Sequence, residues 1–202
     1  MSYEDMCITT WKTLQPVFGD TGAAAIMGNL QAESAMNPKN LQNSYEKKLG
    51  YTDDSYTAAV DAGRISRQKF MNDSAGYGLA QWTHHSRKAN LYDHLIPDCS
   101  IGDLVGQLRF LITEIYSYGG LAEQLKDPKL SLWDKTALVL RKYEKPADQT
   151  DANVDRRNRY SQQFLDKYAV VCPDPTFTIN GEDLLELRSC AKRILEILED
   201  II

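Results

Sequence analysis

The chain lacks several features that mark other classes of protein. Among its 202 residues, no apolar run approaches the roughly 20 residues of a membrane-spanning helix. Its 23 basic residues are outnumbered by 28 acidic residues, so the basic surface needed for bulk nucleic-acid binding is missing. Its four cysteines form no Cys-x-x-Cys pair, which leaves zinc and thioredoxin-like chemistry without support. We therefore expect no membrane insertion, no nucleic-acid partner, no bound metal and no cofactor.

The N-terminal segment also lacks the basic-then-apolar pattern of a secretory signal peptide, because residues 1–11 are acidic. Either the protein leaves its cell by another route, or the chain is a segment of a longer one. The cysteines are expected to be free, buried thiols rather than disulfides. His84, His85 and His94 are not spaced as a set of metal ligands, and no glycine-rich phosphate loop or Ser-His-Asp order is present.

Helical periodicity dominates the pattern of apolar residues. Hydrophobic residues make up 43% and charged residues 25% of the chain, as is typical of one globular domain with an appendage. The exception is 72–83, whose Gly-x-Gly core and aromatic residues favour a tight strand or turn. We therefore predict a mainly α (α+β) fold with a minimal β-hairpin or sheet. The predicted helices cover 3–15, 21–34, 54–62, 64–71, 84–95, 100–117, 131–144 and 150–169.

The C-terminal part differs in pattern from the rest. Residues 172–183 contain turn-forming residues and are predicted to be a linker. Residues 184–202 carry apolar residues at alternating spacings of three and four, which predicts an amphipathic helix. We therefore divide the chain into a main domain, 1–171, and a C-terminal part, 172–202. The helix over 184–202 either docks on its own domain, self-associates or joins a further domain.

One carboxylate, Glu33, lies on the apolar stripe of the helix predicted over 21–34. On a helical wheel it falls roughly 20° from Ile26, and Pro38 prevents the helix from continuing far beyond it. Burial and the helix C-terminal carbonyls disfavour the charged form of such a glutamate, as a general acid for glycoside cleavage requires. The alternative is a frayed last turn with Glu33 in water.

Three segments follow one another in a specific order: GNLQAESAMNP (28–38), AGYGLAQWT (75–83) and LRKYEKPAD (140–148). Over roughly residues 1–170 the chain resembles the phage tail-tip lysozyme family of the lysozyme-like superfamily, which includes goose-type lysozymes and lytic transglycosylases. The resemblance implies a two-lobed, mostly helical fold with a sugar-binding groove. The substrate would be the glycan strands of peptidoglycan, cut at the β-1,4 bond after N-acetylmuramic acid. Glu33 would protonate the glycosidic oxygen.

The resemblance also implies which residues line the groove, because the second segment is similar to the Gly-Leu-x-Gln strand of these families. Gly76 and Gly78 would let the backbone approach the sugar. Core packing of Trp82 and Tyr143, and a structural hydrogen bond from Gln81, stay open as alternatives. The substrate-binding residues implied in this way are Tyr77, Gly78, Gln81, Trp82, Thr83 and, in the third segment, Tyr143.

Glycoside hydrolysis usually needs a second carboxylate, and Asp73, just before the glycine-containing segment, is the candidate. Goose-type lysozymes carry an Asp at a similar place, offset by one residue, but a further goose-type Asp is replaced here by Thr83. With Asp73 as the base, the enzyme would be an inverting hydrolase. Without a base, the acetamido group of the substrate would assist and give the 1,6-anhydro product of a lytic transglycosylase. The loop carboxylates that stay open are Glu46, Asp53, Asp54 and Asp61.

The resemblance implies a muramidase of phage or mobile-element origin that acts outside the cell, at the bacterial wall, as a tail-tip lysin or an endolysin. Without a signal peptide it would be virion-associated or released through a holin or another export route. A non-catalytic wall-binding tail module and an enzyme acting on another glycan, such as chitin, are the alternatives. A basic group either meets anionic wall polymer or forms a solvated helix face paired with Glu144, Asp151 and Asp155. Its members are Arg141, Lys142, Lys145, Arg156, Arg157 and Arg159.

Overall fold

The computed structural model describes residues 1–96 and 98–169. Internal contacts divide the chain into two units, Met1–Ala169 and Val170–Ile202. The predicted linker and the predicted helix over 184–202 lie outside the described residues, as do Cys172 and Cys190. Cys7 and Cys99 are free thiols, of which Cys7 is buried, as expected, and Cys99 is half-buried. None of the described helices combines the length and the hydropathy of a bilayer-spanning segment.

The prediction of a mainly helical fold is confirmed. Two short helices, α2 and α7, were not predicted, because elements of 7 and 6 residues leave little periodicity to detect. In chain order the elements are α1 (Tyr3–Ser34), α2 (Asn43–Leu49), α3 (Asp53–Asp61), α4 (Arg67–Asn72), α5 (His85–Leu95), α6 (Leu104–Ser117), α7 (Leu121–Lys126), α8 (Leu132–Leu138), the π-helix η1 (Val139–Glu144) and α9 (Asp151–Tyr168).

Helix α1 joins the two helices predicted over 3–15 and 21–34. It begins at a capping box formed by Ser2 and Asp5, and it bends at Gly19, whose φ of 71° is not helical. Pro16 lies just before the bend and weakens the helical hydrogen bonding there. The arm after the bend carries a continuous run of buried residues. This buried arm ends at Ala35, which is in the left-handed conformation with a φ of 52°, so Glu33 lies in the last turn.

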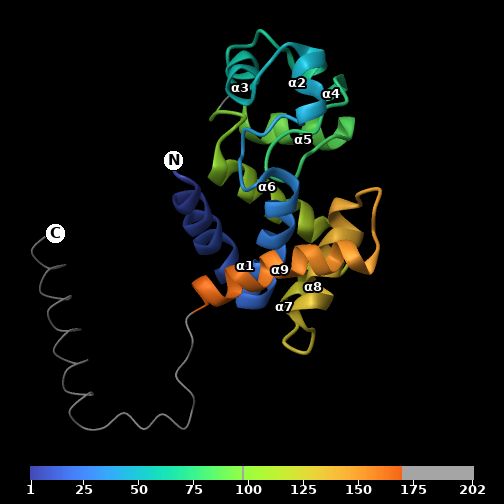
Figure 1. Ribbon diagram of the computed structural model, residues 1–202. Coiled ribbons are helices and arrows are strands. Elements are labelled where there is room, and N and C mark those ends of the chain that lie inside the picture. The colour runs from blue at the N-terminus through green and yellow to red at the C-terminus, as the bar shows by residue number, and fades with distance from the viewer. Residues whose placement is uncertain (97, 170–202) are drawn as a thin grey trace, which may run out of the picture. The chain divides into compact units, whose positions relative to one another are not determined.

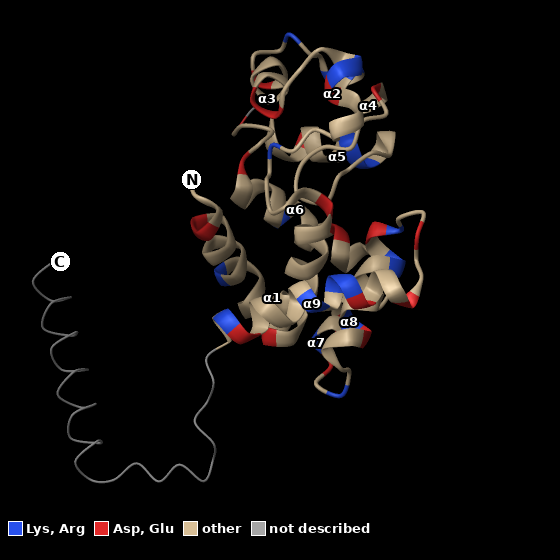
Figure 2. Cartoon of the chain, viewed as in Figure 1, with Lys and Arg blue, Asp and Glu red and all other residues tan. Residues whose placement is uncertain are grey.

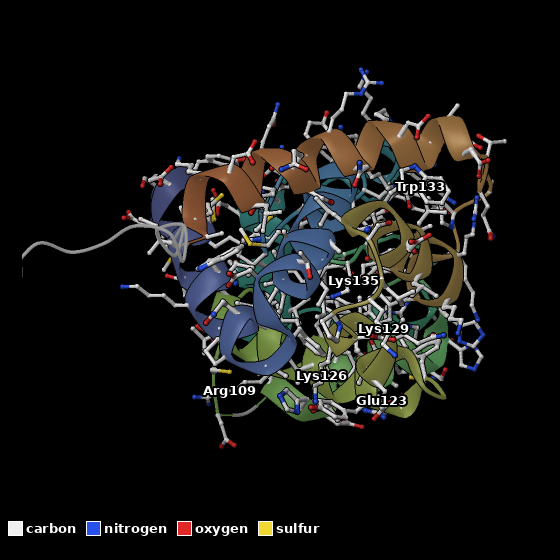
Figure 3. The ribbon with its side chains drawn as sticks, turned by 90° about the horizontal axis from the view of Figure 1, so that it is seen from below. Arg109, Glu123, Lys126, Lys129, Trp133 and Lys135 are labelled. Atoms are coloured by element: carbon white, nitrogen blue, oxygen red, sulfur yellow. The ribbon has the colours of Figure 1, made fainter. Side chains whose placement is uncertain are left out.

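The helices of Met1–Ala169 form two groups (Figure 1). Helices α2–α5 gather at one end, and α1, α7, α8 and α9 gather at the other, with α6 between them. Helix α1 contacts α6, α7, α8, η1 and α9, so it is the element around which the second group assembles. Lys135 links two of these helices, because its buried Nζ, on α8, donates to Thr21 Oγ1 on α1 at 2.7 Å (Figure 3).

The predicted β-hairpin does not form in the described part of the chain. Tyr77 makes only isolated bridges, to Trp82 and to Leu41. Gly78 and Gln81, with φ of 77° and 45°, reverse the chain at once, and the adjacent backbone groups bond instead to the loop after α1. Gly78 N donates to Asn40 O at 2.9 Å, for example. Tyr77 therefore forms one bridge to Trp82 and one to Leu41, in place of the continuous strand pair that was predicted.

Helices α1 and α9 approach each other closely at Gly28. A Cβ atom at this position would lie 2.1 Å from Ser161 Oγ and 2.8 Å from Arg157 O. Only a glycine therefore permits this crossing. Arg157 lies one turn before Ser161 on α9, and Glu33 lies between one and two turns after Gly28 on α1. The close crossing thus brings Arg157 to the end of α1.

Candidate active site

Two cavities meet at the end of α1. The larger, of about 740 Å³, and the smaller, of about 500 Å³, share Glu33, Gln42 and Gln81 in their walls. The other residues of the larger cavity are Ala80, Thr83, His84, Ser86, Arg87, Tyr118, Tyr143, Glu144, Lys145 and Pro146. The smaller cavity continues along Asn40, Asn43, Ser44 and the last turn of α1. Glu33 therefore stands where two concave surfaces adjoin.

The Glu33 side chain is 19% exposed and contacts a buried cation. Arg157 Nη2 donates to Glu33 Oε1 at 2.6 Å, and Arg157 Nη1 donates to Asn29 Oδ1 at 3.1 Å. Asn29 lies one turn before Glu33, so the guanidinium spans two turns of one helix face. Of the two placements considered for Glu33, this geometry matches the partly buried one. The sequence predicted burial of Glu33 but not a guanidinium in direct contact with it.

Glu144 is a second carboxyl of the larger cavity, although its sequence context predicts only a surface partner of basic residues. It is the last residue of η1, before Lys145, whose φ of 51° is left-handed. π-Helical turns often occur at functional sites. Its Oε1 is buried and has no hydrogen-bond partner among the described residues. Burial, and next the negative charge of Glu33, raise the pKa of Glu144 well above its usual range, although Arg87 and Arg157 oppose this shift.

Glu114, on α6, fixes one side of the larger cavity. Its Oε2 accepts hydrogen bonds from Trp82 Nε1 and Tyr143 Oη, both at 2.7 Å. Arg87 donates to its two oxygens at 2.9 and 2.8 Å, and the Arg87 guanidinium lies 4.6 Å from the centre of the Tyr143 ring. Tyr143 borders the cavity but is only 1% exposed, so it forms the wall beneath Arg87. Burial raises the pKa of Tyr143 well above its usual range.

Three of the expected substrate-binding residues belong to the core instead. Trp82 is fully buried and lines neither cavity of Glu33. Tyr77 is also fully buried, and its Oη lies 2.7 Å from Thr57 Oγ1. A Cβ atom on Gly78 would lie 2.7 Å from Gln107 Oε1, an oxygen that accepts a hydrogen bond from Leu79 N. Trp82, Tyr77 and Gly78, which were expected to contact the sugar, therefore pack against other residues of the protein.

Gln81 and Thr83 do line the cavities. Gln81 borders both, and its Nε2 donates to Asn40 Oδ1 at 2.8 Å and to Gly78 O at 3.1 Å. Thr83 is exposed at the larger cavity, where its Oγ1 donates to Gln81 O at 2.9 Å. Together with Tyr143, these residues are the expected substrate-binding residues that share a cavity with Glu33.

Asp73 lies outside both of these cavities. Its carboxylate accepts hydrogen bonds from Ala75 N at 2.9 Å, from Tyr56 Oη and from Lys88 Nζ. Lys88 is fully buried, with Nζ 4.3 Å from the centre of the Phe70 ring. Burial lowers the pKa of Lys88, and the charge of Asp73 opposes this shift. The structure therefore assigns Asp73 the neutralisation of a buried lysine.

Three of the other loop carboxylates also have structural partners. Asp53 accepts from Leu41 N at 2.8 Å, and Asp61 accepts from Ile101 N at 2.8 Å. Asp54 forms an ion pair with Lys39 at 2.8 Å. Each of these contacts connects a loop to α3, although the Asp54 side chain remains 83% exposed. Glu46, the fourth, lies on α2 and lines neither cavity of Glu33.

The basic group divides into surface residues and one buried residue. Segments of both charges lie along α9 (Figure 2). At the surface, Arg141 pairs with Asp151 at 2.5 Å, as expected of a solvated face, and Arg156 donates to Asn153 Oδ1 at 2.8 Å. Arg157, by contrast, is buried against Glu33. Its sequence neighbours do not reveal this difference, because its partner Glu33 lies far away in the chain.

The site is thus a carboxyl group between two adjoining cavities of a helical domain. A sequence profile of the phage tail lysozyme family matches residues 12–168, and the chain belongs to this family. The family indicates a phage-associated, lysozyme-like hydrolase of the cell wall. Comparison with curated proteins and with solved structures found no match.

Proposed function

We propose that the protein is a peptidoglycan muramidase that cleaves the β-1,4 bond between N-acetylmuramic acid and N-acetylglucosamine, with Glu33 as the general acid. The observation that carries the proposal is the place of Glu33 between two adjoining cavities. A glycan strand that is cut internally has sugars on both sides of the broken bond. A proton donor must therefore have binding surface on either side of it.

The chemistry needs one proton transfer at the leaving oxygen. Glu33 gives its proton to the glycosidic oxygen, and the C1–O bond breaks with its electron pair passing to that oxygen. Arg157 holds the Glu33 side chain in one orientation before the sugar arrives. It then stabilises the carboxylate that remains after the proton has left.

Polar groups in the cavity walls supply the contacts to the sugars. Gln81 and Gln42 border both cavities, and Thr83 and His84 line the larger one. Amides, hydroxyls and an imidazole match the hydroxyl and acetamido groups of a glycan. Tyr143 contributes the wall beneath Arg87 rather than a free stacking face.

The identity of the product follows from the second reactant at C1. Attack by water gives a reducing end, and attack by the C6 hydroxyl of the muramic acid gives a 1,6-anhydro end. Asp73 was the reason to favour water, and its engagement with Lys88 removes that reason. Lytic transglycosylation is therefore the second candidate function, and mass spectrometry of released muropeptides separates the two.

The proposed setting is the bacterial wall, reached from outside as a virion-associated tail lysin or from inside as an endolysin. Peptidoglycan glycan strands are the proposed partner, and residues 184–202 are the proposed site of self-association or of a junction to a further domain. A non-catalytic wall-binding module would not require a carboxyl group that a buried arginine holds between two cavities. The alternative of an enzyme that acts on chitin is tested by comparing digestion of chitin with digestion of peptidoglycan by the same protein.

The decisive variant is Glu33→Gln, which keeps the shape of the side chain but not its proton. Glu123→Gln is the matched control, because Glu123 is exposed on α7 (Figure 3) and lines neither cavity. Zymography on purified walls should show clearing by the wild type and by Glu123→Gln, and none by Glu33→Gln. Equal clearing by all three proteins would remove Glu33 from the mechanism.

A further inference from the structure

A third cavity continues from the smaller cavity of the site. It has a volume of about 210 Å³ and lies between α1 and α9. Gln31 lines both this cavity and the smaller one, in whose wall Glu33 follows two residues later on α1. Since Glu33, Gln42 and Gln81 are shared by the smaller and the larger cavity, the three cavities are linked in series. A polymer bound at Glu33 that leaves the smaller cavity past Gln31 therefore meets the third cavity.

Aromatic rings and amide groups make up most of the third cavity. The rings come from the first turn of α1 and from the second half of α9. The hydrophobic face of a sugar ring packs on such aromatic side chains, and amides form hydrogen bonds with its hydroxyl and acetamido groups. Besides Gln31, the lining residues are Tyr3, Tyr160, Gln163, Phe164, Lys167 and Tyr168.

Contacts within the protein hold these rings in place before any ligand binds. Tyr3 Oη donates to Gln31 Oε1 at 2.7 Å, a bond that uses the amide oxygen and leaves both N–H donors of Gln31 unengaged by it. Tyr168 Oη donates to Glu4 Oε1 at 2.9 Å, and its ring stacks on that of Phe164 with the centroids 6.3 Å apart. Tyr3 is 48% exposed, so part of its ring is accessible to a ligand.

The charges of this cavity favour a neutral ligand. Lys167 lies in its wall but forms an ion pair with Glu4, so its charge is already matched. The peptide stems of peptidoglycan carry carboxylates, whereas N-acetylated sugar units are uncharged apart from the lactyl group of muramic acid. The lining is therefore better suited to a sugar unit than to a peptide stem.

We propose that the third cavity is a distal subsite for the glycan strand, in which a sugar unit packs against Tyr3. This inference rests on the muramidase function proposed above and specifies its substrate as a long strand rather than a short fragment. The residues of this subsite take no part in the proton transfer at Glu33. They increase the affinity for long strands and leave the chemical step unchanged.

The test measures binding of peptide-free glycan strands, prepared by amidase treatment of walls, to Glu33→Gln with and without Tyr3→Ala. Tyr116→Ala is the matched control, because Tyr116 is 49% exposed and lines none of the three cavities. We expect Tyr3→Ala to weaken the binding of long strands by about fivefold or more, and Tyr116→Ala to leave it unchanged. The loss should be smaller for a tetrasaccharide, since it occupies fewer subsites.

A second variant, Gln163→Ala, tests the α9 wall of the cavity at an exposed position, and it should weaken the binding of long strands in the same direction. The proposal is overturned if neither Tyr3→Ala nor Gln163→Ala weakens this binding, or if Tyr116→Ala weakens it equally. An equal loss for long strands and for the tetrasaccharide also overturns it.

The binding measurement does not depend on catalysis, so the subsite and the proposed function can fail separately. If Tyr3→Ala weakens binding but the wild type lyses no walls, the muramidase function fails while the subsite stands. If the wild type lyses walls through Glu33 but Tyr3→Ala and Gln163→Ala bind long strands at full strength, the subsite fails while the muramidase function stands.

Discussion

Arg157 Nη2 lies 2.6 Å from Glu33 Oε1, although the two residues are 124 positions apart in the sequence. The contact connects α9 to the last turn of α1 and fixes the carboxyl that borders both cavities. The same guanidinium also donates to Asn29, one turn earlier on α1. The proposed acid therefore depends on the crossing of α1 and α9 as much as on the glutamate itself.

The first prediction concerns the shape of the cation. Arg157→Lys keeps the charge, but an ammonium cannot span Asn29 and Glu33 with two planar donors. We expect the rate of wall lysis to fall about tenfold or more, because the orientation of Glu33 is lost. The control is Arg156→Lys on the exposed side of α9, which should lyse walls at the wild-type rate. Equal rates for the two variants would contradict the orienting role of Arg157.

The second prediction concerns the helix crossing. Gly28→Ala places a methyl group 2.1 Å from Ser161 Oγ, so α9 must move away from α1. We expect the free energy of unfolding to fall by about 1–3 kcal/mol, as is typical of overpacking, and lysis to fall with it. Gly119→Ala is the matched control, since a Cβ there meets nothing within 4 Å. Urea unfolding of both variants measures the difference, and equal stabilities would refute the close crossing.

The third prediction separates stability from chemistry at Asp73. Asp73→Asn removes the charge that neutralises the buried Lys88, which should lower the free energy of unfolding by about 3 kcal/mol or more. Turnover per folded molecule, measured below the unfolding transition, should stay close to that of the wild type. A stable variant without turnover would return Asp73 to the catalytic role suggested by the sequence.

The fourth prediction is a pH dependence of stability. The pKa of Glu144 is raised in the folded state above its ordinary 4.5, so above that pH the folded protein binds a proton that the unfolded chain has lost. This contribution is fully present below about pH 4.5 and declines as pH rises. Glu144→Gln should lose stability less steeply with rising pH, by up to about 1.4 kcal/mol per pH unit. Parallel curves from urea unfolding at several pH values would contradict the raised pKa.

Local patterns were sufficient for most of the helices and for the position of Glu33 on its helix. The apolar stripe that includes Ile26 and Leu30 repeats within one helix, so the wheel position of Glu33 requires no knowledge of distant residues. The sequence predicted separate helices over 3–15 and 21–34, and the structure has a bend between these ranges at Gly19. The Gly-x-Gly segment was less informative, because its bridges go to Leu41 as well as to Trp82. Composition alone does not distinguish that arrangement from a hairpin.

The electrostatic partners could not be predicted, because they join segments far apart in the chain. Asp73 finds Lys88 on α5, and Arg157 finds Glu33 on α1. Glu144 follows a basic run and therefore suggested a solvated partner. Its Oε1 is buried, and the residue lines the cavity that Glu33 and Arg87 also line. The one available indication was its place in the Tyr-Glu-Lys-Pro stretch of the third family-like segment.

The most direct test of the account is mass spectrometry of the fragments released from purified peptidoglycan by the wild type and by Glu33→Gln at equal concentrations. We expect the wild type to release glycans ending in N-acetylmuramic acid, as a reducing or a 1,6-anhydro end, and Glu33→Gln to release none. Fragments ending in N-acetylglucosamine, or equal release by the two proteins, would contradict it.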